Sequence, residues 1–417
     1  MSLSYRSQSV RSNVGRGVRG LGALAIATCM STSIMAAEVY VQPSGEVRAE
    51  VDNNRNFVTV AGGKETTEGY TGTVGATVGI ATPQSDTTIK PQVSFVDFPK
   101  VKEHELEEVA DWLSSYHSPR TDFSVFARFD HRNTYDSELA SAVFNPLFPN
   151  FPTTPETGRV SVSETRTLFD FSPVYQYHVS PRLNIGVSGT YENADYTATI
   201  ANTFVPYDYS LARTFVNWAL GPRSGLTVAV FGSRYSATDG SAVSDAHGAT
   251  VGFDMNWSKT LSSSVELLGQ QTDNTIVKPA PSRGTSNGVG ATFTTSWKGQ
   301  ISSLQLLAGR TFTPSGAGGI YRADQFQVEY DRNLSARFVT TYAVRYIKDV
   351  ALSAQNLGAD YDYLYATAAL KWMATRTFYV LGGGGYTREH YSAAGNIAAS
   401  NGMVYAAFGY QGLGRRP

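Results

Sequence analysis

A junction between an aromatic residue and a short polar turn recurs along the chain and constrains its fold more than any other feature. At each junction an alternating stretch ends in an aromatic residue, a turn follows, and a new alternating stretch begins. The aromatic residues are Tyr116, Tyr177, Trp218, Trp257, Trp297, Tyr330 and Trp372. Most lie 33 to 42 residues apart, and a Pro-rich insertion lengthens the first gap to 61. This period accommodates one strand up, a loop, one strand down and a turn.

Apolar and polar residues alternate on both sides of each junction, as in a strand with two different faces. Before Trp257, for example, Val251 and Phe253 alternate with Gly252 and Asp254. The junction aromatic falls on the apolar face each time, and four of the five Trp residues share this position. A transmembrane barrel would hold them at one interface as an aromatic girdle. A β-sandwich also alternates but does not require its aromatics at one end, and a β-propeller has four short strands per repeat.

The alternation predicts an all-β, up-and-down antiparallel barrel of about 18 strands. The even count places both termini on the periplasmic side, with short turns there and longer loops outside. The weakest prediction is 107–117, where Leu106, Val109, Ala110 and Leu113 also fit a helix, which would reduce the count to 16. The expected strands are 38–50, 68–81, 86–98, 107–117, 121–136, 165–178, 182–197, 208–220, 225–236, 247–258, 262–273, 286–297, 300–313, 322–333, 336–349, 360–373, 376–391 and 400–412.

The composition agrees with strands that face lipid on one side and water on the other. Charged residues are 17% of the chain, against about 25% in soluble proteins. After residue 37 the sequence contains no run of 18 apolar residues, so it predicts no membrane-spanning helix. A barrel of the bacterial outer membrane reconciles these two observations.

The first 37 residues have the pattern of a secretory signal peptide. Four arginines and no acidic residue precede the short apolar core from Leu21 to Ala27, and small residues lead to a cut near Ala36 or Ala37. Thr28, before the only cysteine, Cys29, does not fit a lipoprotein signal. We therefore expect a signal peptide at 1–37 and a single barrel domain at 38–417. That domain has 30 basic and 35 acidic residues, which predicts no nucleic-acid partner.

The sequence offers little for catalysis, and we expect no enzymatic activity, no cofactor and no metal. None of the six His residues stands in a Ser-His pattern of the kind used by outer-membrane phospholipases. The run Gly382–Gly385 lacks the lysine and helix of a phosphate loop, so close packing explains it better. The acidic stretch 103–111 is interpreted as a solvated loop rather than a cation site. The Pro-rich loop 137–165 is long enough to fold inward, although a surface position is the default.

Charged residues on the predicted inward faces are the candidates for contact with a transported solute. Both signs occur among them, and such residues tune passage through a lumen. For any one of them, hydration of a polar interior is an equally good explanation. The candidates are Arg128, Asp130, Arg213, Asp254, Glu329, Arg345 and Lys371.

The start VYVQPSGEVRAEVDNNRN, followed by about 18 alternating strands with SPR-type turns, resembles the β-barrel porin-2 group. That group includes outer-membrane barrels of exopolysaccharide operons. The resemblance covers nearly all of 38–412 and rests on motifs that many barrels share. It implies passage of an extracellular polysaccharide, with periplasmic export proteins as partners, and carries no catalytic motif. One departure is the end GLGRRP, which follows Tyr410 where many such barrels end on an aromatic residue.

Three functional hypotheses follow from the sequence. The leading one is a channel that exports an extracellular polysaccharide, and the second is a general or sugar-selective diffusion porin. The third is a structural or adhesive barrel whose lumen is filled by loops. A siderophore-type receptor is disfavoured because no large plug domain precedes the first strand. All three place the barrel in contact with outer-membrane lipid and lipopolysaccharide.

Overall fold

The computed structural model describes residues 37–57, 64–134, 164–197, 204–277, 281–352, 360–391 and 397–413. These contain 18 strands. The strands are β1(Glu38–Asp52), β2(Thr67–Ala81), β3(Ser85–Phe98), β4(Glu103–His117), β5(Thr121–Asn133), β6(Thr165–Ser180), β7(Leu183–Thr197), β8(Tyr207–Gly221), β9(Ser224–Ala237), β10(Ala242–Asn256), β11(Leu261–Ile276), β12(Ser282–Lys298), β13(Ser302–Ser315), β14(Gly319–Asn333), β15(Phe338–Ala351), β16(Tyr361–Met373), β17(Phe378–Tyr391) and β18(Ile397–Gln411).

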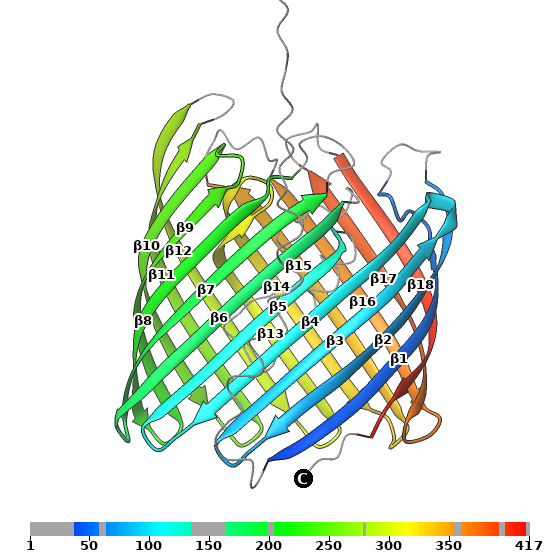
Figure 1. Cartoon of the computed structure of the whole chain (residues 1–417), viewed down its shortest axis with the longest axis horizontal. Helices are drawn as coiled ribbons and strands as arrows, with labels where there is room; N and C mark the ends of the chain where they lie inside the picture. The colour runs from blue at the N-terminus through cyan, green and yellow to red at the C-terminus, as the bar shows by residue number, and fades with distance from the viewer. Residues whose placement is uncertain are drawn as a thin grey trace, which may run out of the picture.

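The strands form one closed antiparallel barrel in which each pairs with its neighbours in sequence (Figure 1). Closure comes from β1 and β18, whose register runs from Ser44 opposite Gln411 to Asp52 opposite Met403. Closure removes the unpaired edges that an open sheet would expose to lipid. Short turns lie at one end, near the C-terminus, and longer connections lie at the other (Figure 1). The predicted fold and strand count are confirmed.

The prediction for 107–117 is confirmed as a strand, and the alternatives of a helix and of 16 strands are wrong. This stretch belongs to β4, which pairs with β3 from Ser85–Tyr116 to Phe98–Glu103 and with β5 on its other side. Apolar spacing alone fits both structures here, but only a strand satisfies the backbone hydrogen bonds of both neighbours. The expectation of a solvated loop at 103–111 is wrong for the same reason.

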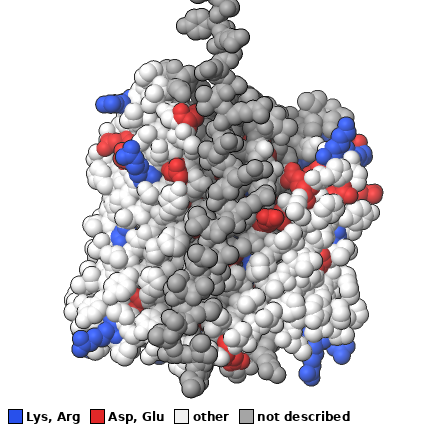
Figure 2. Space-filling view, in the orientation of Figure 1, with Lys and Arg blue, Asp and Glu red and all other residues white. Residues whose placement is uncertain are grey.

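The two faces of the sheet differ as the alternation predicts. Large apolar side chains such as Val74, Val230, Val289 and Val404 point outward and are 59% to 75% exposed. Acidic and basic residues gather toward the two ends of the barrel, with a mainly uncharged band between them (Figure 2). An apolar band between polar rims is what the bilayer requires of a barrel's outer surface.

The predicted girdle residues all lie at or just beyond the ends of even-numbered strands, on the side of the short turns. Tyr116, Tyr177, Trp218, Trp257 and Trp372 are each about two-fifths to one-half exposed on the outer face. Trp297 pairs with Leu304, and Tyr330 with Tyr342, on the same face. They therefore share one level on the outer face, and that this level is a membrane interface stays a prediction.

On the inner face, aromatic rings repeatedly lie over a glycine of the neighbouring strand. Tyr40 lies over Gly79, its partner in register, so a Cβ there would be 2.1 Å from the Tyr40 ring. The same arrangement pairs Phe98 with Gly69, Phe215 with Gly186, Phe231 with Gly248, Tyr379 with Gly409 and Tyr405 with Gly383. The glycine lets each ring lie flat against the wall. This explains why glycines occur inside strands, including part of the run Gly382–Gly385.

Candidate functional site: the lumen of the barrel

The predicted lumen residues all occupy inward positions, as the register shows. Arg128 pairs in register with Asp170, Glu329 with Ala343, Arg345 with Gln327, and Lys371 with Val339. Asp130, Arg213 and Asp254 stand on the same inward rows of β5, β8 and β10. Whether these side chains contact a passing solute stays a prediction.

One group of paired charges lies on the inner wall of β4–β6. Arg128 donates two hydrogen bonds to Asp111, at 2.7 and 3.1 Å. Asp130 accepts from Arg132 on its own strand and from Arg166 on β6, the latter at 3.4 Å. Opposite charges beside each other on this wall offset the cost of holding ions at a protein surface.

A second pair crosses the inner surface of β9 and β10. The Arg213 guanidinium on β8 donates to Thr250 Oγ1 at 3.0 Å and to Glu266 Oε2 on β11 at 3.2 Å. The side chain reaches this far because the inward residues between, such as Ala229 and Gly252, are small. Sequence reasoning found Arg213 but missed Glu266, because only the register reveals that they face each other.

A third group lies where β16, β17 and β18 meet β1. Tyr379 donates to Glu46 Oε2 at 2.7 Å, and Lys371 Nζ lies 4.0 Å from the centre of the Tyr379 ring. Arg48 lies 3.8 Å above the ring of Tyr405. Each ring therefore has a glycine against one face and a cation over the other, and the cation–π contact helps to hold it there.

A buried ion cluster lies at the extracellular end of β1. Arg55 is 4% exposed and donates two 2.8 Å hydrogen bonds to Glu103 on β4. Its guanidinium also lies 3.6 Å above the ring of Phe98, within 3.5 Å of Asp52. This bidentate pair links the segment after β1 to the start of β4, so Glu103 has a structural role.

The hairpin of β13 and β14 turns into the barrel at its extracellular end, which the sequence analysis did not predict. The register of β12 with β13 stops at Ala291–Arg310, whereas β13 and β14 stay paired up to Ser315–Gly319. β13 therefore separates from β12 above Ala291, while β14 stays paired with β15 up to Tyr321–Ala351 and carries β13 with it. It is the yellow segment near the green strands at the top of Figure 1.

The hairpin tip is fixed to the inner wall of β8–β10, three to five strands from β13 around the barrel. Val205 N donates to Gly316 O at 2.7 Å, and the Tyr235 hydroxyl lies 3.4 Å from Ser315 O. Ile320 is 3% exposed and packs in a cluster with Tyr207 and Tyr235. A hairpin that spans from β14 to the inner faces of β8–β10 narrows the lumen at this level. The predicted inward loop, 137–165, lies almost wholly outside the described residues.

The outer rim above β13–β17 carries a row of alternating charges. The register places Arg310, Asp324, Lys348, Asp362 and His390 side by side on five strands. Arg310 donates to Asp324 at 2.5 and 3.0 Å, and His390 Nδ1 lies 2.9 Å from Asp362. Oppositely charged neighbours across strands stabilise a sheet modestly.

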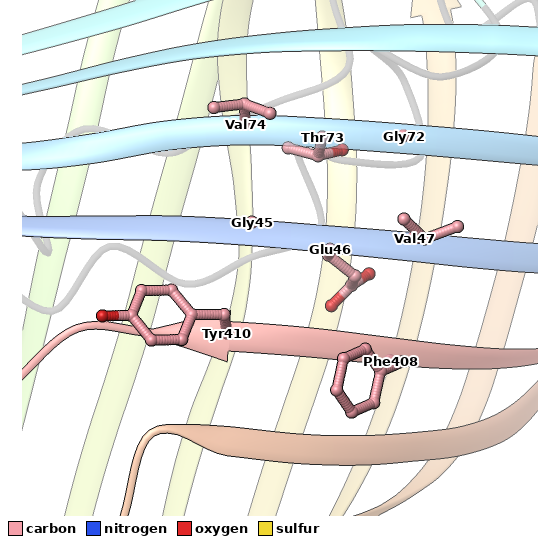
Figure 3. A pocket seen from close by; sticks show the side chains of 8 residues that line it. All are labelled: Gly45, Glu46, Val47, Gly72, Thr73, Val74, Phe408 and Tyr410. Carbon is pink, nitrogen blue, oxygen red and sulfur yellow. The ribbon is translucent and has the colours of Figure 1, made fainter.

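A groove of about 400 Å³ lies on the membrane side of β18, β1 and β2, not on the lumen side. Figure 3 shows its lining, with Val47, Val74, Phe408 and Tyr410 around the two glycines Gly45 and Gly72. The register gives these residues outward positions, and the depression exists because the two glycines have no side chains to fill it. It is therefore not part of a path through the barrel.

Within the described part of the chain, no three His, Cys, Asp or Glu side chains stand close enough to hold a metal ion. No helix among the described residues is long and apolar enough to span a membrane.

No protein-family model matches the sequence, and no curated protein matches it. Among solved structures, Pseudomonas aeruginosa OpdO is 12% identical, with a TM-score of 0.44 over 91% of this chain and 98% of that chain. Acinetobacter baumannii OccAB3 is 8% identical, with a TM-score of 0.43 over 90% and 99%. Pseudomonas aeruginosa OccK2 (OpdF), solved in complex with glucuronate, is 10% identical, with a TM-score of 0.42 over 90% and 99%. Likenesses at this level carry no inference about this chain.

The architecture itself defines the location of the protein. A closed barrel with an apolar outer band, polar rims and a charged inner face satisfies every backbone group within a bilayer. The protein is therefore an integral β-barrel of the bacterial outer membrane. Eighteen strands make a barrel wide enough for an aqueous lumen.

Proposed function

We propose that the barrel is a porin through which small hydrophilic solutes diffuse across the outer membrane. The observation that carries this proposal is the inner wall, where charges stand in pairs such as Arg128–Asp111 and Arg213–Glu266. A solute that leaves bulk water meets fixed donors and acceptors along this wall. These replace part of its hydration and lower the cost of passage.

The inward hairpin of β13 and β14 favours small solutes over a polymer. It occupies part of the cross-section near the extracellular end, where Ile320 packs against Tyr207 and Tyr235. The resemblance to the porin-2 group implies polysaccharide export instead. That hypothesis requires a wider passage, so we keep it as an outcome of the test.

Conductance of the purified barrel in planar bilayers tests the proposal. We expect stable open channels, and a larger conductance for Ile320→Asp, which places a charge in the apolar cluster and releases the hairpin. Asn287→Asp is the matched control, because it adds the same charge to an exposed outward position of β12. The control should conduct as the wild type does.

Two results would overturn the proposal. A wild-type barrel that is folded but never conducts would indicate a structural role. Loss of surface polysaccharide in a deletion strain, restored by the gene, together with no permeation of small solutes, would indicate export. Equal conductance of Ile320→Asp and the wild type would show that the hairpin does not limit the current, and the proposed porin function would still stand.

A further inference from the structure

Three tyrosines follow one another along the inner wall of β16–β18, and we call Tyr379, Tyr405 and Tyr365 the tyrosine strip. Tyr379 is level with Gly409, Tyr405 stands four residues farther along β18, and Tyr365 is level with Asn401, four residues farther again. Four residues of strand span about 14 Å. A solute moving along this wall therefore meets a phenol at three successive levels.

Two of the rings are held on both sides. Tyr379 lies between Gly409 and the Lys371 ammonium group, and Tyr405 lies between Gly383 and the Arg48 guanidinium. A ring fixed in this way loses little conformational freedom when a ligand binds beside it. Preorganised phenols are suited to binding because their hydroxyls both donate and accept hydrogen bonds.

The charges beside Tyr379 and Tyr405 balance, and Arg345 is the register neighbour of the third ring, Tyr365. Arg48 lies 2.6 Å from Glu50. Lys371 lies over the ring of Tyr379, and Glu46 accepts a hydrogen bond from the hydroxyl of the same tyrosine. Two cations therefore stand beside two anions. An ion of either sign is attracted by one pair member and repelled by the other. A neutral molecule rich in hydroxyls can instead use all four groups as hydrogen-bond partners.

We propose that the tyrosine strip is a binding track for neutral carbohydrates. Sugars present hydroxyls that can donate to and accept from the phenol hydroxyls and the charged groups beside them. This inference rests on the proposed function, since it names the class of solute that the porin carries. It applies to a free sugar and to an oligosaccharide alike, and the probe length in the test separates them.

The experiment measures block of the single-channel current by maltotriose, with polyethylene glycol of similar size as a neutral molecule that lacks sugar hydroxyls. Tyr405→Ala removes a ring from the strip. Phe215→Ala is the matched control, because Phe215 also lies over a glycine, Gly186, but on the wall of β7 and β8. Glucose and longer maltodextrins then show whether affinity rises with chain length.

We expect maltotriose to block the wild type and the control at similar concentrations, with affinity reduced about threefold to tenfold in Tyr405→Ala. Polyethylene glycol should block all three weakly and equally. Equal sugar block in Tyr405→Ala and the wild type would overturn the track, as would an equal loss in Phe215→Ala. Conductance without any sugar block would overturn the proposed sugar-binding track but not the proposed porin function.

If the barrel does not conduct, calorimetry with maltotriose on the detergent-solubilised protein decides the matter. Binding that falls in Tyr405→Ala but not in Phe215→Ala would support the track although the porin had failed. No binding would overturn both. Tyr379→Phe refines the result, because it keeps the ring over Gly409 and removes only the hydroxyl that donates to Glu46.

Discussion

Alanine at Gly383 and alanine at Gly382 should have opposite effects on the stability of the barrel, although the two residues are adjacent. A Cβ at Gly383 would lie 2.6 Å from Tyr405 Oη and 2.7 Å from Ala368 O. A Cβ at Gly382 would have nothing within 4 Å. The difference arises because Gly383 faces the lumen beneath a ring, whereas Gly382 faces outward.

The expected magnitudes follow from these distances. Forcing a methyl group against a fixed ring and a backbone oxygen costs about 1 to 3 kcal/mol. Replacing an unobstructed glycine by alanine stabilises by about 0.4 to 1 kcal/mol, because the unfolded chain loses conformational freedom. The two variants should therefore differ by about 1.5 to 4 kcal/mol in free energy of unfolding.

Urea unfolding of the barrel in lipid vesicles, followed by tryptophan fluorescence, measures this difference by linear extrapolation. In a Tyr405→Ala background the cost of Gly383→Ala should fall but not vanish, since the clash with Ala368 O remains. Equal stabilities of Gly382→Ala and Gly383→Ala would refute the reasoning. So would a Gly383→Ala cost that is unchanged when the Tyr405 ring is absent.

Two further predictions concern the extracellular end. Arg55→Ala should destabilise the barrel by about 3 to 5 kcal/mol, because Glu103 loses its bidentate partner and the buried Asp52 loses a neighbouring cation. A double variant Arg55→Met with Glu103→Leu should recover the part of this loss that comes from Glu103 in urea unfolding, and no recovery would contradict the pairing. Arg310→Ala with Lys348→Ala should lower the lipopolysaccharide that co-purifies with the barrel, measured by its phosphate content, because outward cations near the extracellular rim can pair with lipid phosphates. Unchanged lipopolysaccharide would show that these two cations do not bind it.

The sequence predicts the strands and their two faces because both depend on neighbours one or two residues away. Alternation such as Val251–Phe253 against Gly252–Asp254 is a local pattern, and the bilayer enforces it on every strand. Prediction becomes ambiguous at β4, where Leu106, Val109 and Ala110 fit two periods. The choice there is made by hydrogen bonds to β3 and β5, which a local pattern does not contain.

The pairs inside the lumen are beyond local patterns for a different reason. Arg213 and Glu266 are 53 residues apart, and Tyr379 and Glu46 are 333 apart. Each partner looks like an isolated inward charge or ring until the register is known, and a shift of one residue would move it to the other face. The sequence can therefore propose which residues line the lumen, but it cannot say which of them neutralise each other.

The inward hairpin shows how a regular pattern conceals a change of direction. The register of β13 with β14 continues without a break to Ser315–Gly319, so the strand pattern does not record that the hairpin has left β12. The local exception is the apolar pair Ile320 and Tyr321 directly after the glycines at the tip, where an extracellular turn would ordinarily be polar. Both are at most 3% exposed. Burying Ile320 requires an apolar surface, and Tyr207 and Tyr235 supply it on the inner wall. Apolar residues at the tip of an extracellular hairpin are therefore the sequence signal that the hairpin folds into its own barrel.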